Sequence, residues 1–425
     1  MWSYQMNYKP NPLLYGANKD FFSSFKIIIT MRAEVDLAAL SKAVTTAMVR
    51  YPYFSVYAER KENDIQLCHN KQPVPVFNSD RCIVLGTEEC HGHLLTFGCE
   101  GRKIILNASH YITDGMGVSP LLLTVLYLYV SELYGVEGLN PEKIPMPNDM
   151  VQKEEYEYPF PDEPFKIDNE YISKIEVNDA YELNSNEFDN NGLYAYHLHI
   201  PQKAMMKIAN PSDGSPISFL SVMLYRALCK LDNDIEKPVV AHVQHQYRAA
   251  LKAPLSRHSM VSYIPVSLSA KMKNWEVMHQ NTVVRGQILL GSEVSADLNA
   301  VNRFLEVFPN GWNASLSEKE QAMRQYAENS IRNKTFGISY VGKMDWFGLD
   351  TYMEDIHAYI GEKDTRNMLL IEVMTIGEDF TLNFMQSGCG KRYLNAFIEQ
   401  LRNEDIPVSI VGENRYTLCD TEIPK

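Results

Sequence analysis

The segment 107–117, NASHYITDGMG, places a histidine four residues before an Asp-Gly pair. Before it, residues 93–109 contain two β-type runs around a turn at Glu100 and Gly101, which predicts a β hairpin. His110 would stand at the end of the second strand, where loops held by rigid elements often carry functional groups. A structural histidine and a general base both fit this position, because an imidazole titrates near neutrality and can accept a proton from a hydroxyl or an amine.

The residues after His110 suit a tight turn followed by a helix. Gly115 and Gly117 permit either a close backbone approach or a positive φ. Asp114 could orient the imidazole or hold the turn by pairing elsewhere, and the spacing alone does not decide between these roles. A Ser-Pro pair opens the apolar segment 119–134 and predicts a helix over those residues.

Length and composition set the broad class of the protein. A chain of 425 residues exceeds one ordinary core, which favours two domains or one body with two lobes. With 45% hydrophobic and 22% charged residues, the composition is that of a soluble globular protein. The net charge is −13, from 40 basic and 53 acidic side chains, and no basic run occurs. We therefore expect no nucleic-acid partner, because polyphosphate would be repelled.

Three features predict a cytoplasmic protein. The amino terminus lacks a basic region followed by an apolar one, so no secretory signal is expected. The longest apolar run, residues 120–130, is shorter than the roughly 20 residues that span a bilayer, so no transmembrane segment is expected. The seven cysteines are an odd number in a long chain, which favours reduced thiols.

Strand and helix patterns are mixed in both halves of the chain. Residues 136–190 are rich in proline and acid without clear periodicity, and they predict a crossing between two lobes. We therefore predict an α/β (or α+β) fold with lobes at 1–150 and 191–425 and a crossover linker at 151–190. The predicted strands are 20–31, 192–201, 237–248, 258–270, 335–344 and the pair within 367–388, and the further helices are 37–51, 215–231 and 391–407.

The segment from His110 to Gly115 resembles the H-x-x-x-D-G motif of the coenzyme-A-dependent acyltransferase superfamily. That group includes chloramphenicol acetyltransferases, condensation domains of nonribosomal peptide synthesis, plant acyltransferases and alcohol O-acetyltransferases. Three further segments are similar to the family: the Arg-Tyr-Pro element at 50–52, VVAHVQHQYRAALKAP at 239–254, and TFGISYVGKMD at 335–345. The resemblance spans nearly the whole chain and is nearest to the alcohol O-acetyltransferase branch.

Two departures from the family pattern narrow the resemblance. Condensation domains usually carry two adjacent histidines, and here Ser109 takes the place of the first one. The plant branch carries a D-F-G-W-G segment, which we do not equate with MDWFGLD at 344–350. The first departure counts against peptide-bond formation on carrier proteins, but neither departure counts against acyl transfer.

The resemblance implies a fold, a reaction and roles for particular residues. Two chloramphenicol-acetyltransferase-like lobes would enclose a channel, in which His110 acts as general base on the acceptor. Asp114 would pair with an arginine of the second lobe, for which Arg248 is the candidate and Arg257 the alternative. A donor to the oxyanion would come from the strand that carries Ser339 and Tyr340, although both also fit as ordinary strand residues.

The resemblance also implies partners. Acyl-CoA would be the co-substrate, a small and apolar alcohol or amine the acceptor, and no cofactor would be tightly bound. We expect a monomer, because two lobes of one chain can enclose the site. Two alternatives remain open: a stand-alone condensation-type enzyme that uses a carrier-protein thioester, and a catalytically silent binding member of the fold.

Cysteines and histidines crowd the segment 68–99, and these are residue types that bind zinc. The segment nevertheless reads as strands, whose side chains alternate between two faces, and it lacks a paired C-x-x-C. We therefore expect no metal site there.

Overall fold

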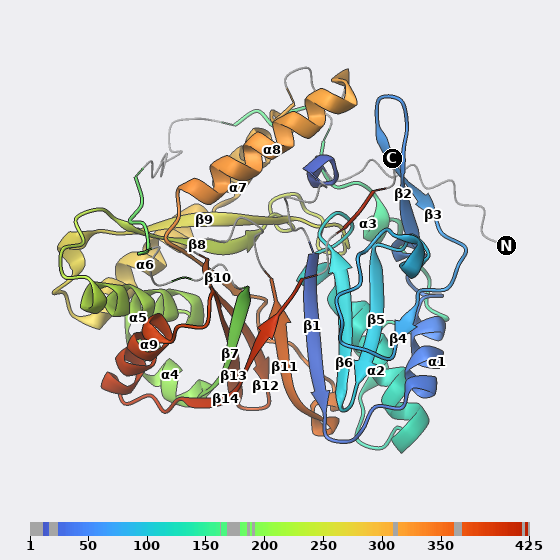
Figure 1. Cartoon of the computed structure of the whole chain (residues 1–425), viewed down its shortest axis with the longest axis horizontal. Helices are drawn as coiled ribbons and strands as arrows, with labels where there is room; N and C mark the ends of the chain where they lie inside the picture. Colours follow the sequence, from blue (N-terminus) through green and yellow to red (C-terminus); the bar gives the residue numbers. More distant parts are fainter. Residues whose placement is uncertain are drawn as a thin grey trace.

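The structure, a computed structural model of the chain, describes residues 12–16, 24–161, 163–167, 179–184, 188, 192–308, 313–360, 368–418 and 421–423. Residues 20–23 of the predicted first strand lie outside this part, as do 162, 168–178, 185–187 and 189–190 of the predicted linker. Figure 1 shows two sheets side by side, with helices on their outer flanks. The mixed α/β class predicted from the sequence is confirmed.

The first sheet has five strands in the order β11-β1-β6-β5-β4. The predicted hairpin is its centre, since β5 and β6 pair antiparallel from Leu95 with Ala108 to Glu100 with Lys103. A separate two-stranded ribbon joins β2 to β3. The strand bounds are β1 Ser24–Met31, β2 Val56–Arg60, β3 Ile65–His69, β4 Val76–Phe77, β5 Leu95–Glu100, β6 Lys103–Ser109 and β11 Met353–Tyr359.

Two helices pack together against the first sheet, α1 (Leu37–Ala47) and α2 (Gly115–Tyr134). The Asp36 carboxylate caps α1 by accepting a hydrogen bond of 2.8 Å from the Ala39 amide. Apolar side chains of both helices and of β1, β5 and β6 form one buried core. This core holds β6 rigid and so positions the residue that follows it.

The helix predicted at 119–134 begins earlier, at Gly115. The reason is that the Asp114 carboxylate, rather than the Ser119 hydroxyl, accepts the amide hydrogen bond of the first turn, from Gly117. Pro120 therefore lies inside the helix, where it lacks an amide donor. The Thr124 hydroxyl donates to the Pro120 carbonyl at 2.9 Å.

The second sheet has seven strands in the order β14-β7-β13-β12-β10-β8-β9. Helices α4, α5, α6 and α9 bury its outer face in a second core (Figure 1). Helices α7 (Val294–Leu305) and α8 (Leu316–Arg332) lie above the sheets in this view, and α3 (Lys153–Tyr156) is a short turn. The other bounds are β7 Leu193–Pro201, α4 Gln202–Ala209, α5 Pro216–Leu231, β8 Val239–Gln246, β9 Val261–Leu268, α6 Val277–Gly291, β10 Phe336–Tyr340, β12 Leu369–Ile376, β13 Asp379–Ser387, α9 Arg392–Asn403 and β14 Ser409–Tyr416.

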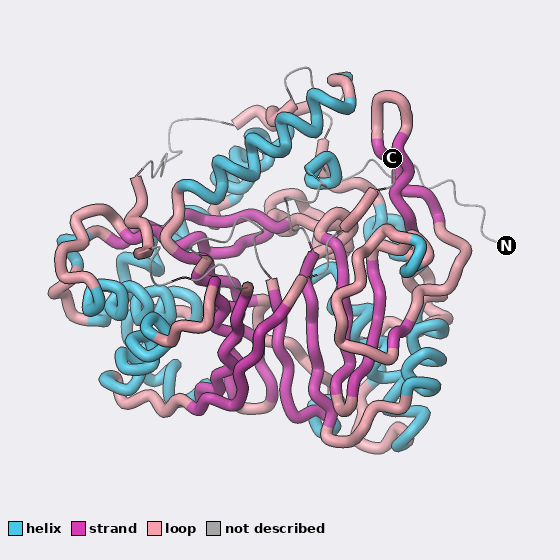
Figure 2. Tube along the Cα trace, viewed as in Figure 1, coloured by secondary structure: helices cyan, strands magenta, loops and turns pink. Residues whose placement is uncertain are grey.

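One strand of the second half of the chain belongs to the first sheet. β11 pairs antiparallel with β1, from Met353 opposite Met31 to Tyr359 opposite Lys26. It also contacts β12 and β13 of the second sheet, so it lies where the two sheets meet (Figure 2). The two sheets therefore do not correspond to two continuous halves of the sequence.

Among the described residues, α2 is the one helix that is long and apolar enough to cross a bilayer. More than half of its apolar window, 56%, is buried inside the protein. That burial is what the core helix of a folded body shows.

Candidate active site

A pocket of about 410 Å³ lies between the two sheets. His110 reaches it from the first sheet, and the second sheet contributes polar side chains from β8, β10 and β12. Most of the wall is apolar, which suits a ligand with a hydrocarbon body. The lining includes Phe25, Ile27, His110, Asp114, Gly115, Gln244, His245, Gln246, Arg248, Ser339, Tyr340, Val341, Ala358, Ile360, Leu370, Glu372 and Met374.

His110 follows the last residue of β6 and lies half-buried at the pocket wall. Its Nδ1 is 3.2 Å from the Thr113 carbonyl oxygen, and its ring packs 4.7 Å from the ring of Phe25. The tautomer that donates from Nδ1 to this carbonyl leaves the lone pair on Nε2. Burial lowers the pKa of His110 below 6.5, although Asp114 and the Thr113 carbonyl act in the opposite direction. The imidazole is therefore neutral at physiological pH, which is the form that accepts a proton.

Asp114 pairs with Arg248, the loop arginine that follows β8. The two groups form a bidentate pair with N–O distances of 2.8 and 3.0 Å, and both side chains are almost fully buried. The same carboxylate also accepts from the Gly117 and Met260 amides, at 2.7 and 2.9 Å. One side chain thus begins α2 and joins the two sheets beside the pocket.

Arg257, the alternative partner, does not contact Asp114. Its Nε lies 3.8 Å from a carboxylate oxygen of Glu155, which is buried. Glu155 also accepts from Arg50, at 2.6 and 3.0 Å, and from the Tyr53 hydroxyl at 2.7 Å. The arginine of the Arg-Tyr-Pro element therefore anchors the segment that leads out of the first lobe.

The two glycines of the turn differ in their surroundings. A Cβ on Gly117 would lie 2.4 Å from the Arg257 carbonyl oxygen and 2.5 Å from the Thr113 hydroxyl. A Cβ on Gly115 would meet only a Val341 methyl at 3.6 Å, an ordinary contact. Neither glycine has a positive φ, so the turn needs a close backbone approach at Gly117 and no left-handed residue.

Ser339 and Tyr340 both line the pocket, and Ser339 makes a hydrogen bond to a residue of the neighbouring strand. Its hydroxyl donates to the Glu372 carboxyl at 2.9 Å, across the adjacent parallel strands β10 and β12. Glu372 was not among the residues singled out from the sequence. The signal for it was one acidic residue in the apolar run of residues 368–376.

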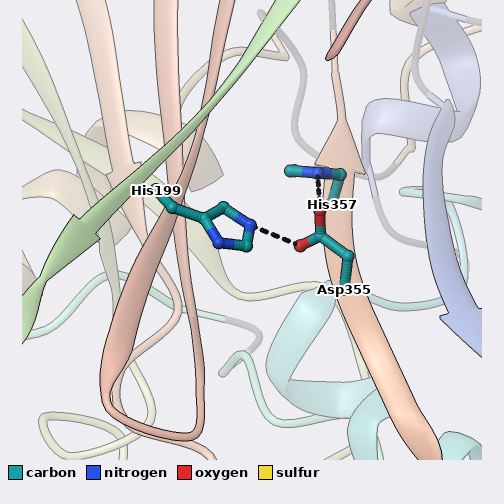
Figure 3. Close-up of side chains that lie close together, drawn as sticks. All are labelled: His199, Asp355 and His357. Atoms are coloured by element: carbon teal, nitrogen blue, oxygen red, sulfur yellow. Dashed lines mark hydrogen bonds and ion pairs between the residues drawn. The ribbon is translucent and has the colours of Figure 1, made fainter. Parts of the chain in front are cut away.

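A second polar cluster bridges β7 and β11 through side chains (Figure 3). His199 reaches from β7 to the Asp355 carboxylate on β11, at 3.1 Å, and the other oxygen of that carboxylate is 2.8 Å from His357 Nε2. Their ligand atoms lie within 4.8 Å of one another, so these three could hold a metal ion. In the part of the chain that is described, the cysteines and histidines of 68–99 form no such group. The cluster's residues do not line the pocket of His110.

Comparison with known proteins addresses the fold. No protein-family model matches the chain, and no curated protein matches its sequence. TRI101 of F. sporotrichioides, solved with coenzyme A and T-2, superposes with a TM-score of 0.61 at 9% identity, covering 95% of this chain and 99% of that one. Polyketide synthase associated protein 5 from Mycobacterium tuberculosis gives 0.56 at 11%, over 91% and 97%. The condensation domain of the Monacolin K synthase MokA gives 0.54 at 11%, over 94% and 96%.

The chain has the fold of these three proteins. The resemblance drawn from the motif is thus confirmed for the fold, with both lobes present. Within this fold, His110 stands between the lobes, and Asp114 and Arg248 link them.

Proposed function

We propose that this protein is an acyltransferase that moves an acyl group, such as acetyl, from acyl-CoA to a hydroxyl or amine of a small acceptor. The observation that carries the proposal is the position of His110 at the wall of the pocket between the lobes, neutral and with Nδ1 against the Thr113 carbonyl. Structures of TRI101 with coenzyme A and T-2 or deoxynivalenol support it, because they have the same fold. We further propose a monomer located in the cytoplasm.

In the proposed reaction, Nε2 of His110 takes the proton of the acceptor as its oxygen or nitrogen attacks the thioester carbon. The new C–O or C–N bond forms as the carbonyl becomes an oxyanion. The C–S bond then breaks, and the CoA thiolate takes up the proton. A base must lie within hydrogen-bond reach of the attacking atom, and holding both substrates in one pocket supplies much of the acceleration.

The test is acyl transfer by purified protein, with pooled alcohols and amines offered to several acyl-CoA donors and the products read by mass spectrometry. His110→Ala should lower the rate about 10²–10⁴-fold, the usual contribution of a general base. His279→Ala, at an exposed position of α6, is the matched control and should leave the rate unchanged. An unaltered rate in His110→Ala would remove the base assignment.

A second candidate is a condensation-type enzyme that takes its acyl group from a carrier protein. The condensation domains of the enacyloxin and Monacolin K synthases favour it, because they share the fold. Ser109 argues against it: the residue in place of the first histidine is fully buried, and its hydroxyl interacts with Thr421 at 3.2 Å. Release of free thiol from acetyl-CoA only when an acceptor is present separates the acyltransferase from the carrier-dependent enzyme.

A further inference from the structure

Glu372 is a buried carboxyl in the pocket wall, and the acyl-transfer chemistry above does not use it. It lies in the middle of β12 and is only 3% exposed, and the other residues of that strand carry no charge. Burying a carboxylate without a counter-charge is costly, so such a group either takes up a proton or pairs with a cation. The question is which group supplies the positive charge.

The charged side chains of the pocket wall that could pair with Glu372 already have other partners. Arg248 lines the pocket but donates to Asp114, to Gln246 and to the carbonyls of Ser256 and His258. His245 lies 3.0 Å from the Asp297 carboxylate. Among the described residues, the Glu372 carboxyl accepts a hydrogen bond from the hydroxyl of Ser339. A counter-charge for the ionised form of Glu372 is thus left for a ligand to supply.

The groups around Glu372 are suited to an organic cation. Burial raises the pKa of Glu372 to about 8, while the hydrogen bond from Ser339 acts to lower it. The carboxyl is therefore mostly protonated in the empty pocket at pH 7, and a bound cation would favour its ionised form. Phe25 and Tyr340 also line the pocket, and aromatic faces attract ammonium groups.

We propose that the acceptor carries an ammonium or quaternary ammonium group that pairs with the Glu372 carboxylate. This rests on the proposed function, since it names the chemical class of the acceptor. The cationic group is a recognition group, separate from the hydroxyl or amine that meets His110, because a protonated amine has no lone pair with which to attack. Ser339 is a positioning residue in this arrangement, since it holds the carboxyl through its hydroxyl.

Binding of choline and of its uncharged isostere 3,3-dimethylbutan-1-ol, measured by calorimetry, tests the proposal without turnover. At pH 8.5, choline should bind at least about tenfold more tightly than the isostere, since a favourable charge pair in a partly desolvated site exceeds 1.4 kcal/mol. With a pKa of about 8 for Glu372, choline affinity should rise roughly 25-fold from pH 6.5 to 8.5, as the carboxyl ionises. The affinity of the isostere should not change.

Variants show whether the preference for choline and its pH dependence come from Glu372. Other titratable or charged groups also line the pocket, namely His110, Asp114, His245, Arg248 and Tyr340. Glu372→Gln keeps an acceptor for Ser339 and should lose both the preference for choline and its rise with pH. Ser339→Ala should move the rise to higher pH, because it removes the hydrogen bond that lowers the pKa of Glu372. Glu378→Gln, in the exposed turn after β12, is the matched control.

Each outcome separates this inference from the acyl-transfer proposal. If wild-type protein does not prefer choline, or if Glu372→Gln keeps the preference, the cation site is wrong even when acyl transfer is observed. If choline binds as expected but no donor and acceptor react, the acyl-transfer proposal is wrong and the cation site stands. Should Glu372→Gln fail to fold, the midpoint of the pH dependence in Ser339→Ala decides, and an unshifted midpoint overturns the proposal.

Discussion

At the residue scale, Gly115 and Gly117 lie in one turn but have different neighbours. A Cβ on Gly117 would overlap the Arg257 carbonyl, whereas a Cβ on Gly115 has room. Gly117→Ala should lower the free energy of unfolding by about 1–3 kcal/mol, the usual cost of overpacking. Gly115→Ala should change it by less than about 1 kcal/mol. Urea unfolding of the two variants makes this comparison, and equal losses would contradict it.

Asp114 and Arg248 form the buried ion pair beside the pocket. Asp114→Ala should cost about 3–5 kcal/mol of stability, because it leaves the guanidinium buried without its counter-charge. Adding Arg248→Met to that variant should cost less than the sum of the single changes. Chemical unfolding of the four proteins of this cycle gives the coupling energy, and simple additivity would mean that the pair contributes little.

His110 sets the acid limb of the pH profile in the proposed reaction. Burial lowers its pKa below 6.5, and the neutral imidazole is the active form. The limb of kcat/KM should therefore lie below pH 6.5, with activity constant from there to neutral pH as far as this group is concerned. A pH–rate profile from pH 4 to 8 measures it, and a midpoint above 6.5 would contradict the assignment.

At the element scale, β11 depends on the cluster around Asp355. Burial acts to raise the pKa of Asp355, but hydrogen bonds from His199 and His357 outweigh it and hold that pKa below its usual value. The Asp355 hydrogen bond is the largest influence on the pKa of His199, which is raised above 6.5. The cluster thus joins a strand of the first sheet to a strand of the second.

Asp355→Asn should lower stability by about 1.5–3 kcal/mol, typical of hydrogen bonds to charged groups. The raised pKa of His199 contributes stability that is full below pH 6.5 and lost as pH rises through its folded value. The lowered pKa of Asp355 contributes stability that is present above about pH 3.8 and lost on further acidification. The difference between wild type and variant should therefore be larger at pH 5.5 than at pH 8.5. Thermal unfolding at both values checks this, and a difference that grows with pH would contradict it.

At the scale of the whole molecule, local sequence patterns predicted the elements better than their assignment to sheets. The hairpin and α1 follow from alternation, a capping aspartate and a proline, all of which act locally. β11 and β14 were not predicted, because their sequences lack a strong apolar alternation and their place depends on partners far along the chain. α2 was predicted to start four residues late, since the sequence alone did not show that the Asp114 carboxylate accepts the Gly117 amide as the helix cap.

The candidate site was likewise predicted only in part from the sequence. His110, Asp114 and Arg248 came from a motif and its resemblance, and the structure places all three at one pocket. Glu372 was missed because a single acid in an apolar run has no meaning until the neighbouring strands show what it faces. The Arg50–Glu155 pair was missed for the same reason, since its members lie 105 positions apart.

The placement of β11 predicts how fragments of the chain behave. A fragment ending near residue 190 contains β1 and β6 but not β11, so the row of backbone groups of β1 that faces β11 would be exposed beside Ile27 and Ile29. We expect this fragment to be insoluble alone and to become soluble when the remainder of the chain is co-expressed. If the fragment alone were soluble and unfolded cooperatively, that result would contradict this expectation.

The same strand constrains the order of events on the ribosome. Arg102, at the tip of the β5–β6 hairpin, pairs with Glu354, which is translated 252 positions later. At about 5–20 residues per second, the nascent first lobe waits roughly 13 to 50 s for its edge strand. A newly made chain therefore passes through a period in which its amino-terminal half has left the exit tunnel but is still open to chaperones.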